Sequence, residues 1–295
     1  MSFFNAGLTR SPIQCVEGGT VSTEMDEVSI EEPLQIELTH VRGGKKHRYS
    51  VAVMMRTPGN DAELAAGFLF TEGIIKRHDD WSRIEYIDNN HVLVEFSRYA
   101  YLDVSKLERQ SFVSSSCGVC GKRSIAAVFS EQQYPLTPGS PRLEVDLIHR
   151  LPEIQRKAQD NFHRTGGIHA SALFDANGNL LSLFEDVGRH NALDKLIGNQ
   201  MFADKLPLTQ HILLLSGRAS FELIQKACMA GIRVVAAVGA PSSLAVQLAR
   251  ETSMTLLGFV RENRFNVYAD AGRLQFHRTS APEVGSQPTE ESKLQ

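Results

Sequence analysis

The strongest constraint on the fold is a regular alternation of apolar and amphipathic segments in the second half of the chain. Continuous apolar runs of strand length are separated there by segments with helical periodicity. This arrangement indicates a sheet that is at least partly parallel and is covered by helices on both faces. The predicted strands are residues 212–215, 234–238 and 255–259, and the predicted helices are residues 221–230 and 244–251.

An antiparallel hairpin is predicted immediately before this region. Strand-like residues 169–174 and 180–184 flank Asn177-Gly178, a dipeptide typical of two-residue hairpin turns. A helix is then expected to begin near Asn191, ahead of the first apolar strand.

A smaller group of strands around one helix is predicted in the first part of the chain. The helix follows a Thr-Pro-Gly turn, with Asn60 as its N-cap and Glu63 placed to close a capping box. Strands around a single helix are typical of a small α+β domain. The strand-like segments are residues 34–38, 49–55, 83–87 and 92–96.

The two ends of the chain lack these patterns. The first residues show no sustained periodicity, and the last ones are rich in Ser, Pro, Glu, Gln and Lys, a composition that forms cores poorly. We therefore expect four segments. They are a flexible leader at residues 1–28, a small α+β domain at 29–112, a larger α/β domain at 113–278, and a disordered tail at 279–295.

Composition excludes several broad classes of function. The net charge is −3, so nothing indicates a general nucleic-acid or membrane-surface binder. No apolar run approaches the roughly 20 residues of a membrane span, and the first residues do not form a secretory signal. Four cysteines in 295 residues do not make a disulfide framework, which favours a reducing compartment. A cytoplasmic protein is expected.

A pair of closely spaced thiols forms the clearest chemical motif. Cys117 and Cys120 lie among glycines and serines, and Lys122 and Arg123 follow directly. Nearby cations lower the pKa of a thiol, and only the thiolate is a good nucleophile or metal ligand. By spacing alone, half of a zinc site, a redox disulfide and a nucleophile are equally good interpretations.

Two polar clusters stand where a predicted strand gives way to a helix. The first, residues 185–191, is either a capped helix start or a polar ligand site, in which His190 is a better hydrogen-bond donor than general base. In the second, Gly217 and Arg218 follow the apolar strand at 212–215. A glycine and an arginine at a helix N-terminus favour a phosphate cradle over a simple cap.

Two further segments are weaker as local signals. The Gly-rich entry at residues 165–169 either turns the chain or lets a phosphate approach the backbone, and its spacing matches no established phosphate motif. After the last apolar strand, two arginines three residues apart could bind a pyrophosphate while an asparagine reads a base edge. This last segment comprises Phe259, Val260, Arg261, Glu262, Asn263 and Arg264.

Taken together, the motifs have a specific order along the chain. They are Thr57-Pro58-Gly59 with residues 63–69, Cys117-Gly118-Val119-Cys120-Gly121, Thr165-Gly166-Gly167-Ile168-His169-Ala170, residues 185–192, Ser216-Gly217-Arg218, and residues 240–245. With this set the chain resembles the FdhD family, the sulfurtransferases that serve formate dehydrogenase. The resemblance extends from about residue 30 to 275 and leaves only the two ends uncovered.

The resemblance implies a function that composition cannot supply. Family members are sulfur carriers that accept persulfide sulfur from a cysteine desulfurase and pass it to the molybdenum bis(molybdopterin guanine dinucleotide) cofactor. Formate dehydrogenase then becomes active. The resemblance also implies a homodimer and a second domain with a three-layer α/β/α, cytidine-deaminase-like fold.

Residue roles follow from the same resemblance. Cys117 would be the thiol that is loaded with sulfur, and Cys120 would relay the sulfur or resolve the persulfide. The anionic cofactor is the bound substrate, with GDP as its mimic, and no metal of the protein's own is expected. His190, Gly217, Arg218 and residues 259–264 would hold this substrate.

Two other functions fit parts of the sequence. A non-catalytic chaperone that binds the cofactor and docks on formate dehydrogenase would need the same ligand motifs but no reactive thiol. A zinc deaminase needs His-x-Glu followed by Pro-Cys-x-x-Cys. The nearest match, at His169, lacks the glutamate, and the paired cysteines precede it.

Overall fold

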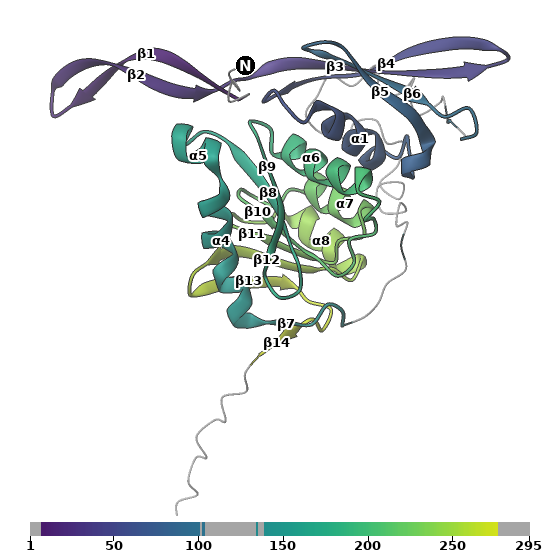
Figure 1. The fold of residues 1–295 in the computed structure, drawn as a ribbon. Helices are drawn as coiled ribbons and strands as arrows, with labels where there is room; N and C mark the ends of the chain where they lie inside the picture. The colour runs from purple at the N-terminus through teal and green to yellow at the C-terminus, as the bar shows by residue number, and fades with distance from the viewer. Residues whose placement is uncertain (1–6, 101, 104–133, 135–138, 277–295) are drawn as a thin grey trace, which may run out of the picture.

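A computed structural model describes residues 7–100, 102–103, 134 and 139–276 (Figure 1). Cys117 and Cys120 lie outside the described residues, as does the tail predicted from residue 279. Among the described helices, none has the length and apolar character that crossing a membrane requires.

The larger part of the structure is built on a six-stranded sheet with the order β13-β12-β11-β10-β8-β9. Its strands are β8 (His169–Phe174), β9 (Leu180–Asp186), β10 (Ile212–Leu215), β11 (Val234–Ala237), β12 (Thr255–Arg261) and β13 (Arg264–Ala269). Strand β11 pairs in parallel with β10 and with β12, and the other neighbours are antiparallel. The prediction of a partly parallel sheet is confirmed, whereas β13 was not predicted.

Helices cover both faces of this sheet (Figure 1). Leu213 and Leu215 of β10 join one buried cluster, whereas Ile212 and Leu214 join another, because successive side chains of a strand point to opposite faces. The first cluster includes residues of α6 (Arg189–Phe202), α7 (Phe221–Met229) and α8 (Ser243–Glu251). The second includes Leu151 of α4 (Val145–Ala158), a helix that contains Pro152 and is followed by α5 (Asp160–Thr165).

The N-terminal part contains a four-stranded sheet with the order β4-β3-β6-β5, and helix α1 (Asp61–Thr71) packs against it. The strands are β3 (Glu32–Arg42), β4 (Lys45–Arg56), β5 (Trp81–Asp88) and β6 (His91–Phe96), with a short helix η1 (His78–Asp80) before β5. All four strands and the helix were predicted. The expected capping box is wrong, because Asn60 adopts a φ of 56° and its side chain makes no cap hydrogen bond.

The leader expected at residues 1–28 is corrected for its described residues. Strands β1 (Leu8–Glu17) and β2 (Thr20–Ser29) pair along their whole length as an antiparallel hairpin. Figure 1 shows this hairpin projecting away from the rest of the molecule. Most of its side chains are exposed on both faces, so the sequence carries no alternation of apolar and polar residues.

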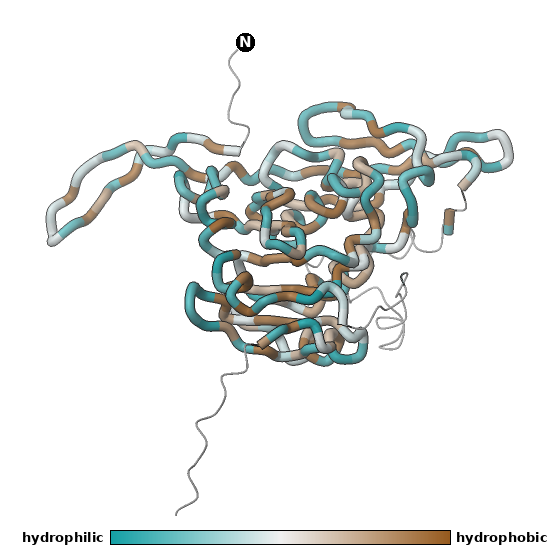
Figure 2. The backbone as a smooth tube through the Cα atoms, turned by 60° about the horizontal axis from the view of Figure 1, so that its bottom comes forward, coloured by the Kyte–Doolittle hydropathy of each residue, from teal (hydrophilic) through white to brown (hydrophobic). Residues whose placement is uncertain are grey.

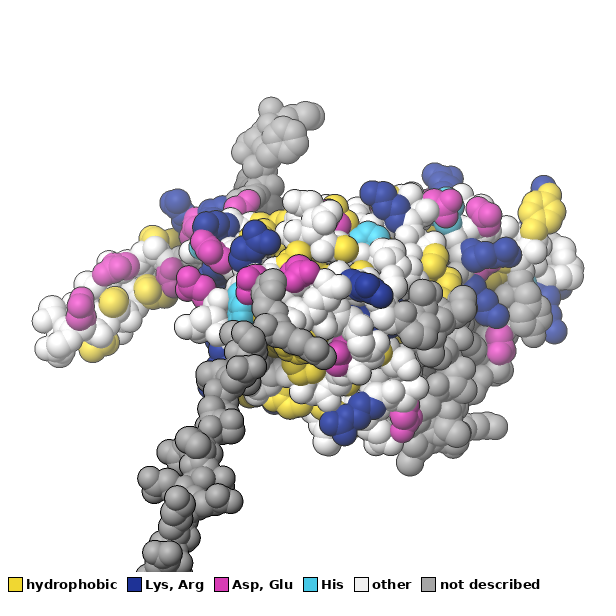
Figure 3. All heavy atoms as spheres, turned by 90° about the horizontal axis from the view of Figure 1, so that it is seen from below, with side chains coloured by type: hydrophobic (Ala, Val, Ile, Leu, Met, Phe, Trp, Pro, Cys, Tyr) yellow, Lys and Arg dark blue, Asp and Glu magenta, His cyan; other side chains and the backbone are white. Residues whose placement is uncertain are grey.

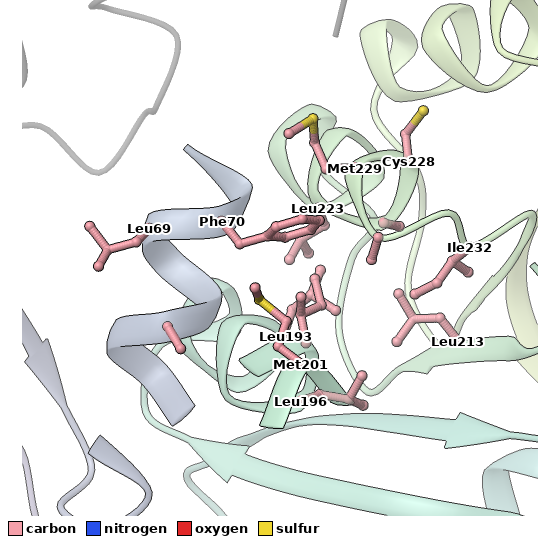
Figure 4. Close-up of a cluster of buried hydrophobic side chains, with 14 of the residues drawn as sticks. Leu69, Phe70, Leu193, Leu196, Met201, Leu213, Leu223, Cys228, Met229 and Ile232 are labelled. Carbon is pink, nitrogen blue, oxygen red and sulfur yellow. The ribbon is translucent and has the colours of Figure 1, made fainter. Parts of the chain in front are cut away.

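Helix α1 joins the two parts by crossing α6 at very close range. A Cβ atom added to Gly67 would lie 1.9 Å from the carbonyl oxygen of Asp194, and one added to Gly198 would lie 1.9 Å from that of Glu63. Figure 4 shows Phe70 of α1 among side chains of α6 and α7 such as Leu193 and Leu223. One buried cluster therefore runs through both parts.

A buried ion pair reinforces this junction. The Lys226 ammonium of α7 donates to both carboxylate oxygens of Asp194 on α6 and to the hydroxyl of Thr71 on α1. Burial alone would lower the pKa of Lys226, but Asp194 and Glu72 raise it above its usual value. The ammonium is thus held charged between three helices.

Two smaller expectations are corrected. Asn177-Gly178 is not a two-residue hairpin turn, because β8 and β9 are joined by residues 175–179 and the Asp175 carboxylate accepts from the backbone N–H groups of Asn177 and Asn179. A short parallel pair, β7 (Leu143–Glu144) with β14 (Leu274–Gln275), was not predicted.

Candidate functional site

A cavity of about 560 Å³ opens where β10, β11 and β12 end, and we call it the strand-end pocket. Its floor and rim come from Ser216 and Gly217 after β10, Val238 after β11, and Val260 and Arg261 at the end of β12. Carboxyl ends of parallel strands are the usual ligand position in open α/β sheets. The remaining lining residues are Pro152, Gln155, Arg156, Gln159, Phe162, Gly166, Gly167, Ile168, His169 and Val187.

Four segments singled out in the sequence meet at this pocket. The Gly-rich entry contributes Gly166, Gly167 and His169, and the first polar cluster contributes Val187. The second polar cluster contributes Gly217, and the segment after the last apolar strand contributes Arg261. These segments are far apart along the chain, and the sheet brings them together. The structure therefore places several weak sequence signals in one cavity.

The backbone at the end of β10 is packed tightly. A Cβ atom added to Gly217 would lie 3.2 Å from Nδ1 of His169, and one added to Gly239 would lie 2.9 Å from the carbonyl oxygen of Gly217. The Ser216 hydroxyl accepts a hydrogen bond of 2.8 Å from the backbone N–H of Ala170. Glycine at position 217 thus leaves room for the His169 ring at the pocket wall.

The segment 259–264 divides between the pocket and the outer surface. Phe259 adopts a φ of 52° in a bulge of β12 and is 40% exposed, a backbone conformation that side-chain-bearing residues rarely adopt. Arg261 lines the pocket and donates from Nη1 to the carbonyl oxygens of Val238 and Val260, each at 2.8 Å. Arg264 lies opposite Arg261 on β13 and does not line the pocket.

The pocket favours an anionic ligand with a planar group. None of its described lining residues is Asp or Glu, whereas Arg156 and Arg261 are cationic. The Arg156 guanidinium lies over the ring of Phe162, 3.8 Å from its centroid. Aromatic and guanidinium faces of this kind stack on flat rings.

One buried amide of the pocket has no partner among the described residues. Gln159 is 3% exposed, and its Nε2 makes no hydrogen bond there. One turn earlier, Nε2 of Gln155 donates to the carbonyl oxygen of Leu214. An unpaired buried donor is costly, so a ligand that accepts from Gln159 would gain affinity. The sequence motifs did not include these residues. Their spacing of four from the buried Leu151, which places Gln155 on the same helix face, was a signal that could have found them.

His190 lies away from the pocket wall, in the first turn of α6. Its Nε2 is 3.4 Å from the Ser220 hydroxyl and 3.9 Å from a carboxylate oxygen of Glu222. Burial, with Lys226 and Arg189 nearby, lowers the pKa of His190 to about 4, so its ring is neutral at pH 7. Burial, with Arg189, also lowers the pKa of His169 on the pocket wall.

The acidic members of the first polar cluster have structural partners. Glu185 accepts from the backbone N–H groups of Asn161 and Phe162 at the start of α5. Asp186 pairs with Lys195 at 2.8 Å and accepts from the backbone N–H of Thr57. These contacts position α5 beside the pocket and fix the Thr-Pro-Gly turn. Arg218, from the second cluster, is exposed and does not line the pocket.

In the part of the chain that the structure describes, no group of three or more His, Cys, Asp or Glu side chains lies close enough together to hold a metal ion. The paired cysteines are not among these residues.

Fold and pocket together define a class of protein: an α/β protein with an arginine-containing cavity at the ends of its parallel strands, joined to a smaller strand-rich part. The sequence model of the FdhD/NarQ family matches residues 29–275. The chain belongs to this family.

Relatives match over most of their length. The chain is 46% identical over 276 residues to the sulfur carrier protein FdhD of Streptomyces avermitilis, covering 90% of this chain and 95% of that protein. It is 43% identical to the protein of the same name from Picrophilus torridus, covering 84% and 92%. A crystal structure of a putative formate dehydrogenase accessory protein from Desulfotalea psychrophila has the same fold, with a TM-score of 0.68 and 23% identity, over 91% of this chain and 100% of that one.

Proposed function

We propose that this protein is a sulfurtransferase that carries sulfur from a cysteine desulfurase to the molybdenum bis(molybdopterin guanine dinucleotide) cofactor of formate dehydrogenase. Membership of the FdhD/NarQ family and relatives named as sulfur carrier proteins support the sulfur-transfer part. The strand-end pocket carries the cofactor part, because it is cationic, lined by an aromatic ring, and large enough for one nucleotide unit.

Sulfur loading is a thiol exchange. The Cys117 thiolate attacks the terminal sulfur of a desulfurase persulfide, a new S–S bond forms at Cys117, and the desulfurase cysteine leaves as a thiolate. No net oxidation takes place. No proton is gained or lost either, because one thiolate is consumed and another is released. Cys120 then takes the sulfur onward, or displaces it as hydrosulfide by forming a disulfide with Cys117.

Binding of the cofactor is assigned to the pocket and its rim. The Arg261 guanidinium and the backbone of Gly166 and Gly217 suit phosphate oxygens, and the Phe162 ring with Arg156 suits a base. Gln159 Nε2 can donate to a carbonyl or ring nitrogen on the edge of a guanine. GDP is therefore the natural small probe.

The remaining parts of the proposal concern fold, assembly and place of action. A sheet in which an antiparallel hairpin, β8–β9, adjoins parallel strands β10, β11 and β12 supports a cytidine-deaminase-like fold for the second domain. We include a homodimer, a cysteine desulfurase and formate dehydrogenase as partners, and the cytoplasm as the compartment.

Mass spectrometry after incubation with a desulfurase and cysteine tests sulfur transfer directly. We expect the protein to gain one sulfur atom on Cys117, and Cys117→Ala to leave formate dehydrogenase assembled but inactive. Cys120→Ala should keep the persulfide on Cys117 yet deliver it poorly. Cys228→Ala, a change at a buried core position, serves as the control.

The rival function is that of a cofactor-binding chaperone that handles no sulfur. The pocket suits it equally well, so the thiols alone discriminate between the two. A Cys117→Ala variant that activates formate dehydrogenase as well as the wild type does would remove the sulfurtransferase and leave the chaperone. We expect the Cys117→Ala variant and the wild type to bind GDP with the same affinity.

A further inference from the structure

The β1–β2 hairpin, which we call the arm, contacts the rest of the described molecule only near its base. There Arg164 of α5 pairs with Glu27, and the Thr165 hydroxyl is 3.0 Å from the Ser29 hydroxyl. An isolated two-stranded hairpin is marginally stable in water. The outer arm therefore needs a surface to pack against. The described residues of this chain do not supply that surface.

One face of the arm presents apolar side chains to solvent. Val16 and Val21 lie directly opposite each other, as do Pro12 and Met25, and residues two apart on a strand share a face. Val16 is 68% exposed, and Val21 and Met25 are each 59% exposed. Figure 2 shows hydrophobic stretches interspersed with hydrophilic ones along the arm.

The outer arm is also acidic. Glu17, Glu24 and Asp26 are exposed there, whereas the arm's cation, Arg10, lies near the base, 3.8 Å from Glu27. In Figure 3 the outer arm, at the left, carries magenta and yellow side chains and no dark blue ones. The matching surface should be basic with apolar side chains in it.

Such a surface exists at the other end of the same molecule. The turn between β3 and β4 carries exposed Arg42, Lys45 and Lys46, with Val41 beside them 44% exposed. We call this the basic tip. Exposed apolar side chains continue along β4, where Val53 is 67% exposed.

The placement of these two surfaces suits a two-fold axis. Figure 1 shows the arm and the basic tip extending in opposite directions along the same edge of the molecule. In an isologous pair each copy offers the same surface, so residue i meets j and j meets i. Two copies that meet along this edge, turned by half a rotation, bring each acidic arm to the other copy's basic tip.

We propose that a second copy of this chain covers the arm, with each arm packed on the partner copy's basic tip and β4. The interface rests on the homodimer included in the proposed function. It goes beyond sulfur transfer, since it is built from residues of the arm, the basic tip and β4, none of which lines the strand-end pocket. Charge complementarity selects the register, and the apolar side chains of the arm supply the buried area.

Reciprocal charge reversal in the full chain provides the test. One variant carries Glu24→Lys with Asp26→Lys, a second carries Arg42→Glu with Lys45→Glu, and a third carries all four changes. Sedimentation equilibrium gives the dimer dissociation constant for each. All changed residues are exposed, so far-UV circular dichroism should show unaltered folding.

We expect a wild-type dimer, at least a tenfold weaker dimer in each two-site variant, and recovery in the four-site variant because both charges are then exchanged. Lys205→Glu, an exposed change in the larger part, should leave the dimer unchanged. A monomeric wild type, unchanged dimers in both two-site variants, or no recovery in the four-site variant would each overturn the proposal. GDP binding, measured in parallel, tests the pocket independently of this interface.

Discussion

Arg261 and Arg264 face each other across the β12–β13 hairpin, but only Arg261 lines the strand-end pocket. A charge-assisted hydrogen bond contributes about 1.5–3 kcal/mol, and about 1.4 kcal/mol is a factor of ten in affinity. We expect Arg261→Ala to weaken GDP binding tenfold or more and Arg264→Ala to weaken it less. Isothermal titration calorimetry measures both, with exposed Arg83→Ala as the control.

Equal GDP affinities in Arg261→Ala, Arg264→Ala and the control would place the nucleotide outside the pocket. Arg218, which is exposed beside the end of β10, would then be the next residue to change. Persulfide loading of Cys117 should be unaffected by any of these changes, since sulfur acceptance and cofactor binding are separate steps.

His190 gives the fold a predictable sensitivity to acid. Its pKa is lowered from 6.5 to about 4 in the folded protein, so the unfolded chain binds more protons between these pH values. The resulting stability is fully present above pH 6.5 and is lost as the pH falls toward 4, by at most about 3 kcal/mol.

Urea unfolding at several pH values checks this linkage. Between pH 6.5 and 4 the free energy of unfolding should fall more steeply in the wild type than in His190→Gln, because the variant has no ring to protonate. His163→Gln, at an exposed position of α5, should behave like the wild type. Parallel profiles for the wild type and His190→Gln would contradict a buried neutral ring.

At the scale of elements, the crossing of α1 and α6 depends on two residues without side chains. An added Cβ at Gly67 or Gly198 would lie 1.9 Å from a backbone oxygen, so the helices would have to move apart. Overpacking of this kind costs about 1–3 kcal/mol, and we expect Gly67→Ala and Gly198→Ala each to destabilise the protein by that amount.

Denaturant unfolding of both variants measures the effect. Gly167→Ala is the matched control, because the nearest atom to its added Cβ is 3.7 Å away. If Gly67→Ala and Gly198→Ala unfold at the wild-type denaturant concentration, the two helices do not meet as closely as described.

Most elements were predictable where one face of a strand or helix is buried. Strands β8, β10 and β11 and helix α7 were predicted within about two residues, because apolar periodicity records burial directly. Strands β1 and β2 were missed because neither face is covered. Strand β13 was missed because its exposed Arg264 and its half-buried Asn266 are residue types typical of a loop. Apolar periodicity in the sequence predicts a strand or helix only where one face of that element is buried.

For the whole molecule, the shared core predicts a single cooperative unfolding transition. One buried cluster includes residues of the four-stranded sheet, of α1, and of α6, α7 and α8. Trp81, the chain's only tryptophan, is 7% exposed and packs against Phe202 of α6, with ring centroids 5.9 Å apart. Its fluorescence therefore reports on the junction between the two parts.

We expect tryptophan fluorescence and far-UV circular dichroism to give the same denaturant midpoint, since the junction and the helices unfold together. Gly67→Ala should shift both midpoints equally. Two separate midpoints, with fluorescence changing first, would mean that the N-terminal part detaches and unfolds by itself.

By itself the sequence determined the elements with a buried face, the partly parallel sheet, the paired cysteines and the family to which the chain belongs. Only the tertiary structure decided that Gly166, Gly217 and Arg261 share one pocket with Gln159, and that His190 does not line this pocket. The physical reason is that periodicity and motif spacing are local properties of a chain. A pocket is made by segments that only the sheet order and helix packing bring together.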